Sequence, residues 1–397
     1  MPRAVGRTGR ALLGHAGRDP RAPFPGARLR VHPQKPRVAE RPPRAPHGPR
    51  AAFRIARRAA ALLAALLLGP APAAAGLQLP PGFSVHVYVS GEGFGAGIGT
   101  RGVPSLSTLA FDETGTLYLA RTGRRYSGGE VEDVWPIYRI TPGGARLTPA
   151  TEAGFFYGPP LPNAQVAAVR GGRELLVTTF DRERKVGVLY RLVDGRAELV
   201  AGGTPERGAP LLSQPEGAAV DSAGNIYVAD RARGAVVKLD PSGRVVDPRW
   251  LAVSRPRLVV ARGDRLWIGS DGDVEAPWQR GAGEVWTAAP GSAPAVALRG
   301  PIAAALGVSP TGHLFVADRH AAKIVFLDAE GKRVEFVSFT DGDAPRSLGF
   351  APVTPDTRRA GIAGDLFVIT ISRGTWQVNE ILRISGPFDE LVQGRKR

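Results

Sequence analysis

The sequence predicts an all-β protein, a six-bladed β-propeller of four-stranded blades, preceded by a disordered leader and a signal peptide. Three observations lead to this fold class: a sequence repeat, short runs of Val, Ile, Leu and Tyr between tight turns, and no sustained helical spacing after residue 76. Six copies of the repeat, each averaging about 50 residues, are typical of a propeller in which every copy forms one blade.

The repeat is clearest in residues 215–243 and 303–331, which match without a gap 88 residues apart. Each copy has the order strand, tight turn, strand, loop, strand, because the apolar runs are separated by Asp-x-x-Gly or Ser-x-x-Gly. The turn glycine is expected to adopt a positive φ. The remaining copies lie at residues 106–121, 164–180, 255–270 and 345–371.

The segment 83–89 alternates apolar and polar residues but has no repeat of its own. An isolated strand of this kind at the start of a propeller can complete the last blade. We therefore expect residues 83–89 to supply the outer strand of the sixth blade and close the ring.

The N-terminal 75 residues differ in composition from the rest of the chain. Residues 1–49 are rich in Pro, Arg and Gly, which predicts disorder. Met1 is the only methionine, so translation could instead begin at a non-ATG codon, such as that of Val38, which would leave a signal peptide of normal length. Residues 50–75 have arginines, an apolar run at 59–68 and Ala73-Ala74-Ala75, as in a secretory signal peptide. The run is about half the length of a membrane helix. We expect a periplasmic or secreted domain at 76–397 without a membrane span, exported by the general or the twin-arginine route.

The formal charge of +16 is concentrated in this leader. Residues 1–75 hold 15 Lys and Arg against Asp19 and Glu40, so the other 322 residues carry 37 basic and 34 acidic groups. A nearly neutral domain lacks the basic face that a phosphate backbone requires, so no nucleic-acid partner is expected. Cysteine is absent, which excludes disulfides and thiolate metal sites.

The pattern P-x-G-x-A-V-D-x-x-G-x-x-Y-V-A-D resembles the NHL repeat over residues 215–243 and 303–331, with a fair match at 104–121. Residues 79–83 and 364–368 also resemble the ends of soluble quinoprotein glucose or sorbosone dehydrogenases. Gluconolactonases and regucalcin share this six-bladed fold. Because one fold supports many functions, the resemblance implies the architecture and leaves the activity open.

In such a propeller, the start of each inner strand and the loop between the second and third strands lie around one mouth of the central channel. Glu216 and Arg346 belong to blades that face each other, so an acid and a guanidinium are expected on opposite sides of this mouth. Aligning the repeats places six residues at the inner-strand starts: Ser107, Gln165, Glu216, Pro256, Ala304 and Arg346.

The second loops contribute Arg121, Arg319 and His320 as further candidates for ligand binding. Asp230 and Asp318 fall at the strand-end aspartate of the repeat, where a carboxylate commonly accepts backbone N–H bonds from the following turn. We expect that structural role for both. Longer second loops carry Tyr126, Trp278 and Trp376, which are residue types that anchor ligands or pack beneath their own loops.

Two enzyme classes are alternatives to binding. A lactonase of the gluconolactonase type would need calcium, for which Glu216, Asn163 and Asp343 are the candidate ligands. A quinoprotein dehydrogenase would need a histidine base, and His320 is the one histidine of the mature chain placed in a loop on that face. We favour an exported binding module for an unknown small molecule or protein partner on the channel-mouth face. Calcium is a possible cofactor.

Overall fold

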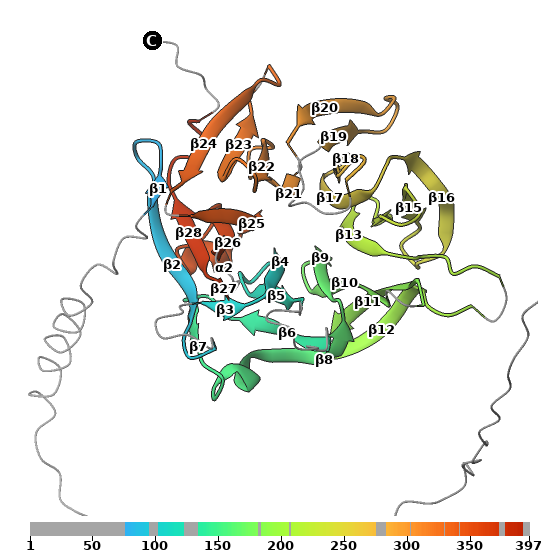
Figure 1. The fold of residues 1–397 in the computed structure, drawn as a ribbon, viewed down its shortest axis with the longest axis horizontal. Helices are drawn as coiled ribbons and strands as arrows, with labels where there is room; N and C mark the ends of the chain where they lie inside the picture. Colours follow the sequence, from blue (N-terminus) through green and yellow to red (C-terminus); the bar gives the residue numbers. More distant parts are fainter. Residues whose placement is uncertain are drawn as a thin grey trace, which may run out of the picture. The chain divides into compact units, whose positions relative to one another are not determined.

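The computed structural model describes residues 76–94, 102–122, 134–181, 184–205, 208–274, 283–301, 303–328, 330–340, 342–372 and 378–391. These residues belong to one compact unit, and their strands form six radial sheets around a central channel (Figure 1). The six-bladed propeller is therefore confirmed. No helix in these ranges is long and apolar enough to cross a membrane.

In blades 1 to 3 the strands are used in chain order, from an inner strand at the channel to an outer strand. Blade 1 contains β4 (Leu106–Phe111), β5 (Leu117–Arg121), β6 (Val134–Ile140) and β8 (Phe156–Pro162). Blade 2 contains β9 (Gln165–Arg170), β10 (Glu174–Asp181), β11 (Val186–Val193) and β12 (Arg196–Gly202). Blade 3 contains β13 (Pro215–Val220), β14 (Ile226–Asp230), β15 (Ala235–Leu239) and β16 (Val245–Ala252).

Blades 4 to 6 follow the same order, and the last two each gain a fifth strand that the repeat does not encode. Blade 4 contains β17 (Pro256–Arg262), β18 (Arg265–Ser270), β19 (Gly283–Ala288) and β20 (Ala295–Gly300). Blade 5 contains β21 (Ala303–Val308), β22 (Leu314–Asp318), β23 (Lys323–Leu327), β24 (Arg333–Phe339) and, outermost, β1 (Leu77–Gln78). Blade 6 contains β25 (Asp343–Phe350), β26 (Leu366–Ser372), β28 (Ile381–Ser385), β2 (Ser84–Gly91) and β7 (Ala145–Leu147).

Strand β2 closes the ring as the sequence predicts. It pairs antiparallel with the third strand of blade 6, with Ser84 opposite Ser385 and Val87 opposite Leu382. The first and last parts of the described chain therefore share one sheet, and β7 of the first repeat extends it in parallel. A small ladder between β3 (Val103–Pro104) and β27 (Val378–Asn379) adds a second connection between these parts of the chain.

The turn between the first and second strands of a blade also follows the prediction. Gly115, Gly224 and Gly312 have φ values of 84°, 83° and 97°. In blade 3, Asp221 Oδ1 accepts a 2.8 Å bond from the Asn225 backbone N–H, which stabilises the turn. These turns define one face of the propeller, here called the turn face, opposite the channel mouth.

In the described part of the chain, two short helices interrupt the strands. The insertion in the sixth repeat contains helix α2 (Pro355–Arg359), where the Thr354 and Thr357 side chains form a capping box. A 3-10 helix, η1 (Glu152–Phe155), precedes β8. Neither alters the radial arrangement of the sheets.

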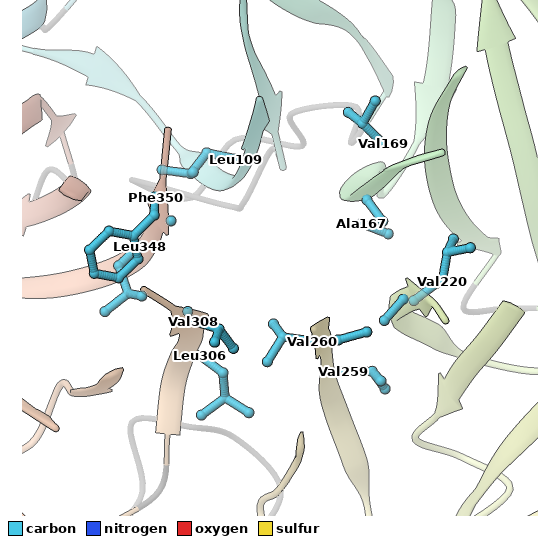
Figure 2. Close-up of a pocket in the computed structure, with 16 residues that line it drawn as sticks. Leu109, Ala167, Val169, Val220, Val259, Val260, Leu306, Val308, Leu348 and Phe350 are labelled. Atoms are coloured by element: carbon cyan, nitrogen blue, oxygen red, sulfur yellow. The ribbon is translucent and has the colours of Figure 1, made fainter. Parts of the chain in front are cut away.

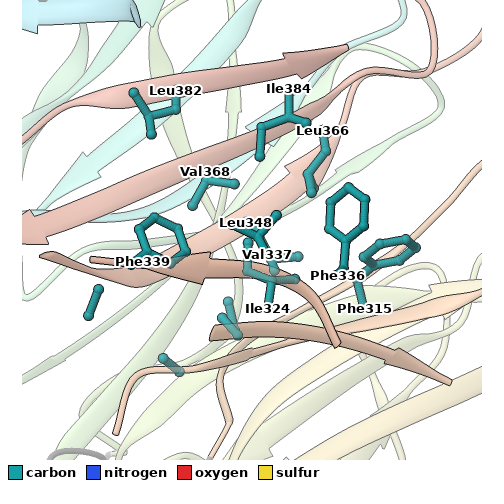
Figure 3. Close-up of a cluster of buried hydrophobic side chains, with 14 of the residues drawn as sticks. Phe315, Ile324, Phe336, Val337, Phe339, Leu348, Leu366, Val368, Leu382 and Ile384 are labelled. Atoms are coloured by element: carbon teal, nitrogen blue, oxygen red, sulfur yellow. The ribbon is translucent and has the colours of Figure 1, made fainter. Parts of the chain in front are cut away.

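The core consists of apolar layers between neighbouring blades. Blades 5 and 6 enclose the layer drawn in Figure 3, where Phe315, Phe336, Leu366 and Ile384 pack between the sheets. Phe315 is 1% exposed, and its ring centroid lies 5.0–6.0 Å from those of four other phenylalanines. This interface holds the closing blade in the ring.

A β-bulge recurs in the inner strands. In blade 3, Pro215 pairs with Asp230 and Gly217 with Ala229, so Glu216 is the extra residue. A register shift also falls within the first five residues of every other inner strand. Because a bulge redirects side chains, this device controls which residues reach the channel mouth.

Candidate functional site

The bulges place Glu216, Ala304 and Arg346 at equivalent positions of blades 3, 5 and 6, as the repeat alignment predicts. The expected position of Pro256 is wrong by one residue. Pro256 pairs with Ser270 as Pro215 pairs with Asp230, so Arg257 is the residue that corresponds to Glu216. The turn of blade 4 has only two residues between Arg262 and Arg265, and this shorter turn displaced the alignment.

Blades 3 and 4 form a cluster of four charged side chains at the mouth: Glu216, Arg231, Arg257 and Asp271. Arg231 Nε lies 3.4 Å from Asp271 Oδ2 and 3.9 Å from Glu216 Oε1. Arg257 Nε lies 3.1 Å from Asp271 Oδ1. The side chains are 1–17% exposed, so their charges are largely removed from water and are neutralised by one another.

This cluster is anchored to its surroundings. Arg257 also donates to the carbonyl oxygens of Ala303 and Ala304 in blade 5, and Arg231 Nη2 donates to the Val274 carbonyl at 3.2 Å. Gly217 allows the approach of the neighbouring strand, since a Cβ there would lie 2.7 Å from the Arg257 carbonyl oxygen.

Arg231 and Arg257 were not predicted from the sequence, although an Asp-Arg pair recurs at 230–231 and 318–319.

Glu216 differs from Asp271 in having one carboxylate oxygen that remains available. Gln214 Nε2 donates to Oε1 at 2.7 Å, whereas Oε2 forms no hydrogen bond with the residues that the structure describes and is not fully buried. Burial raises the pKa of Glu216 above its usual value near 4.5, and the neighbouring Arg257 and Arg231 oppose this rise. The second carboxylate oxygen can accept a hydrogen bond from a ligand at the mouth.

Blade 2 presents a second available acceptor, on Gln165. Its Nε2 donates to Thr122 Oγ1 at 3.1 Å, and Thr122 in turn donates to Ser107 Oγ at 2.8 Å. Among the described residues, Gln165 Oε1 has no hydrogen-bond partner, and the atom is not fully buried. Ser107 and Gln165, both candidates from the sequence, are thus joined in one network across blades 1 and 2.

Asn163, two residues before Gln165, and Thr178, the partner of Gln165 across the sheet, have unsatisfied oxygens. Asn163 Nδ2 donates to the Phe180 carbonyl at 2.9 Å, while Asn163 Oδ1 and Thr178 Oγ1 are buried without a hydrogen-bond partner. Such buried polar groups are commonly satisfied by internal water. Asn163 is 6% exposed and therefore belongs to the interior of the blade.

Arg346 and Asp343 lie on β25, across the channel from β13 (Figure 1). Arg346 is 8% exposed and Asp343 is half-buried at the first position of the strand. The contacts between neighbouring inner strands place blades 3 and 6 on opposite sides of the ring. Glu216 and Arg346 therefore belong to facing blades, as expected.

Arg121 participates in a compact cluster within blade 1. Its guanidinium carbon lies 3.7 Å from the centroid of the Trp135 ring, and Nη1 lies 3.2 Å from both Tyr138 Oη and Glu152 Oε2. Tyr138 Oη donates to the same Glu152 oxygen at 2.6 Å, and burial raises the pKa of Tyr138. Arg121 is therefore largely engaged in packing.

The strand-end aspartates have the structural role expected of them. Asp230 accepts backbone N–H bonds from Ser213, Gln214 and Arg233, and Asp318 accepts one from Ala321. Arg319 and His320 occupy the tight turn after Asp318, where His320 is exposed and Arg319 is half-buried. The other three candidates, Tyr126, Trp278 and Trp376, lie outside the described residues, as does the predicted leader.

The donor set at the mouth does not suit calcium. Calcium takes six to eight oxygen ligands, but Glu216 is flanked by two guanidiniums and Asp271 is paired with both. Within the described ranges, no three His, Cys, Asp or Glu side chains are gathered as a metal site. A divalent ion beside Arg231 and Arg257 would also be repelled.

Comparisons with known proteins found one repeat family and several solved structures. Residues 212–239 match the NHL repeat. Solved structures of similar fold include a gluconolactonase from Xanthomonas campestris, with 15% identity, a TM-score of 0.48, and 72% of this chain and 87% of that one covered. An aldose sugar dehydrogenase from Escherichia coli has 15% identity and a TM-score of 0.47, with 77% and 99% covered. No curated protein matches the sequence.

Proposed function

We propose that this six-bladed propeller is an exported binding module that captures a small polyhydroxylated ligand at the channel mouth. The observation that carries the proposal is the pair of available acceptor oxygens, Glu216 Oε2 and Gln165 Oε1, on neighbouring blades. Ligand hydroxyl groups are the natural donors to such oxygens. Export rests on the predicted signal peptide at residues 50–75.

Preorganisation supports binding at this place. Gln214 and Arg231 hold Glu216 in position, and the hydrogen bond to Thr122 holds Gln165. Side chains held in this way lose little conformational freedom when a ligand arrives. Catalysis of lactone hydrolysis would instead require a metal that the mouth is poorly built to hold.

The first test is catalytic. We expect the purified protein to leave the hydrolysis rate of glucono-1,5-lactone at its spontaneous value, with and without EDTA, because the guanidiniums beside Glu216 disfavour the calcium ion that this hydrolysis would need. A pH-stat or indicator assay measures this rate. Hydrolysis that is accelerated by the protein and abolished by EDTA would support the calcium-dependent lactonase instead.

A binding titration with D-glucitol, a neutral polyol, complements this assay. Wild-type protein should bind it, and Glu216→Ala should weaken binding about tenfold or more, as expected for loss of a charge-assisted hydrogen bond. Glu335→Ala removes an exposed acid that pairs with Lys323 in blade 5 and serves as the matched control. Equal affinities of wild type and Glu216→Ala would place the ligand elsewhere.

A further inference from the structure

A pocket opens on the turn face, at the opposite end of the channel from the mouth. It has a volume of about 340 Å³, within the usual size range of small-molecule sites. Its walls come from the ends of β17, β21 and β25, which belong to blades 4, 5 and 6. Its lining residues are Ala261, Arg262, Val308, Ser309, Pro310, Phe350, Ala351, Pro352 and Val353.

The pocket continues into the central channel. Ala261, Val308 and Phe350 line both cavities, and the channel cavity measures about 260 Å³. Figure 2 shows the apolar side chains of the inner strands arranged around the open channel, including Phe350 and Val308. The channel also exposes the unpaired backbone edges of these strands, which favour water. An apolar ligand group is therefore better accommodated in the turn-face pocket than in the channel.

The apolar walls are rigid and partly open to solvent. Val353 is 46% exposed, whereas most aliphatic side chains of the described strands are buried in the blades. Pro310 and Pro352 have fixed backbones, and the Phe350 ring is held edge-on by Phe315 and Phe388, with centroids 5.0 and 5.2 Å away. Flat, immobilised surfaces of this kind suit an aromatic ring.

Arg262 is the one charged residue in the lining. Its Nη1 donates to the Ser309 carbonyl oxygen, and within the described residues it forms no ion pair. The guanidinium has five N–H donors, so several remain for another partner. Asp389 is the nearby acid that interacts with His313, yet it does not pair with Arg262. A cation at the rim of an apolar pocket is complementary to an anion that carries an apolar body.

We propose that the turn-face pocket binds an aromatic monocarboxylate. Its ring lies against Phe350, Pro310 and Val353, and its carboxylate accepts bonds from Arg262. This site is separate from the channel mouth of the proposed function, so either proposal can fail without the other.

Calorimetric titration with 4-tert-butylbenzoate, compared with its neutral alcohol, tests the inference. Wild-type protein should bind the acid at least tenfold more tightly than the alcohol, and Arg262→Gln should remove that preference without changing affinity for the alcohol. Arg244→Gln is the matched control, because Arg244 is an exposed arginine in a turn-face loop of blade 3.

A second variant tests the location. Val308→Phe should fill the pocket and abolish binding of both compounds, with circular dichroism confirming that the propeller remains folded. Three outcomes would overturn the proposal: no binding of the acid to wild type, equal affinities for acid and alcohol, or unchanged binding by a folded Val308→Phe variant.

Discussion

Replacing Phe315 by alanine is expected to lower the free energy of unfolding by about 4 kcal/mol. Phe315 is 1% exposed, and its ring contacts Phe326, Phe336, Phe350 and Phe388. Its loss would leave a cavity between blades 5 and 6, where rigid strands limit collapse. Blade 6 lies on one side of this cavity, and its sheet joins the first and last parts of the described chain.

Urea or thermal unfolding followed by circular dichroism measures this loss. Leu199→Ala is the control, because Leu199 is 63% exposed on β12 and should change stability by less than about 0.5 kcal/mol. A similar small change for Phe315→Ala would contradict the assignment of this aromatic layer to the stabilising core.

Replacing Asp230 by alanine is expected to cost about 3 kcal/mol. The Asp230 carboxylate is fully buried and accepts three backbone N–H bonds, from Ser213 at 2.6 Å, Gln214 at 3.0 Å and Arg233 at 3.2 Å. Burial raises its pKa, and these bonds oppose that rise by stabilising the charged form. Without the carboxylate, the three donors lose their partner in a region with little access to water.

The same unfolding measurement tests Asp230, with two comparisons. Asp230→Asn keeps one acceptor oxygen and should lose less stability than Asp230→Ala. Asp240→Ala removes a partly exposed turn carboxylate of the same blade, which accepts bonds from Ser242 and Arg244, and should have a smaller effect. Equal losses at positions 230 and 240 would show that burial does not strengthen this motif.

The sequence was sufficient for the fold where each blade carries its own local pattern. Residues 215–243 and 303–331 repeat the turn glycine and the strand-end aspartate, and the alternation of residues 83–89 identifies a strand without a repeat. Strands β1 and β7 were not predicted, because they pair through only two and three residues. Such short pairings depend on neighbouring blades and leave no periodic signal.

The candidate site was predicted only in part, because its partners come from different blades. Glu216 and Gln165 were identified from their place in the repeat, whereas Arg257 was missed when the short turn of blade 4 shifted the alignment by one residue. The contact of Arg231 with Asp271 joins blades 3 and 4 and depends on the tertiary arrangement. The turn-face pocket likewise arises where three strand ends meet, and no single repeat encodes it.

Calorimetric titration of the purified protein with calcium chloride tests the central claim most directly, since it separates a binding module from a calcium-dependent hydrolase. We predict no stoichiometric binding at micromolar concentrations, because Arg231 and Arg257 already neutralise the acids of the mouth. Stoichiometric binding of micromolar affinity that is abolished by Glu216→Gln, but kept by Glu335→Gln, would contradict the account and establish the mouth as a calcium site.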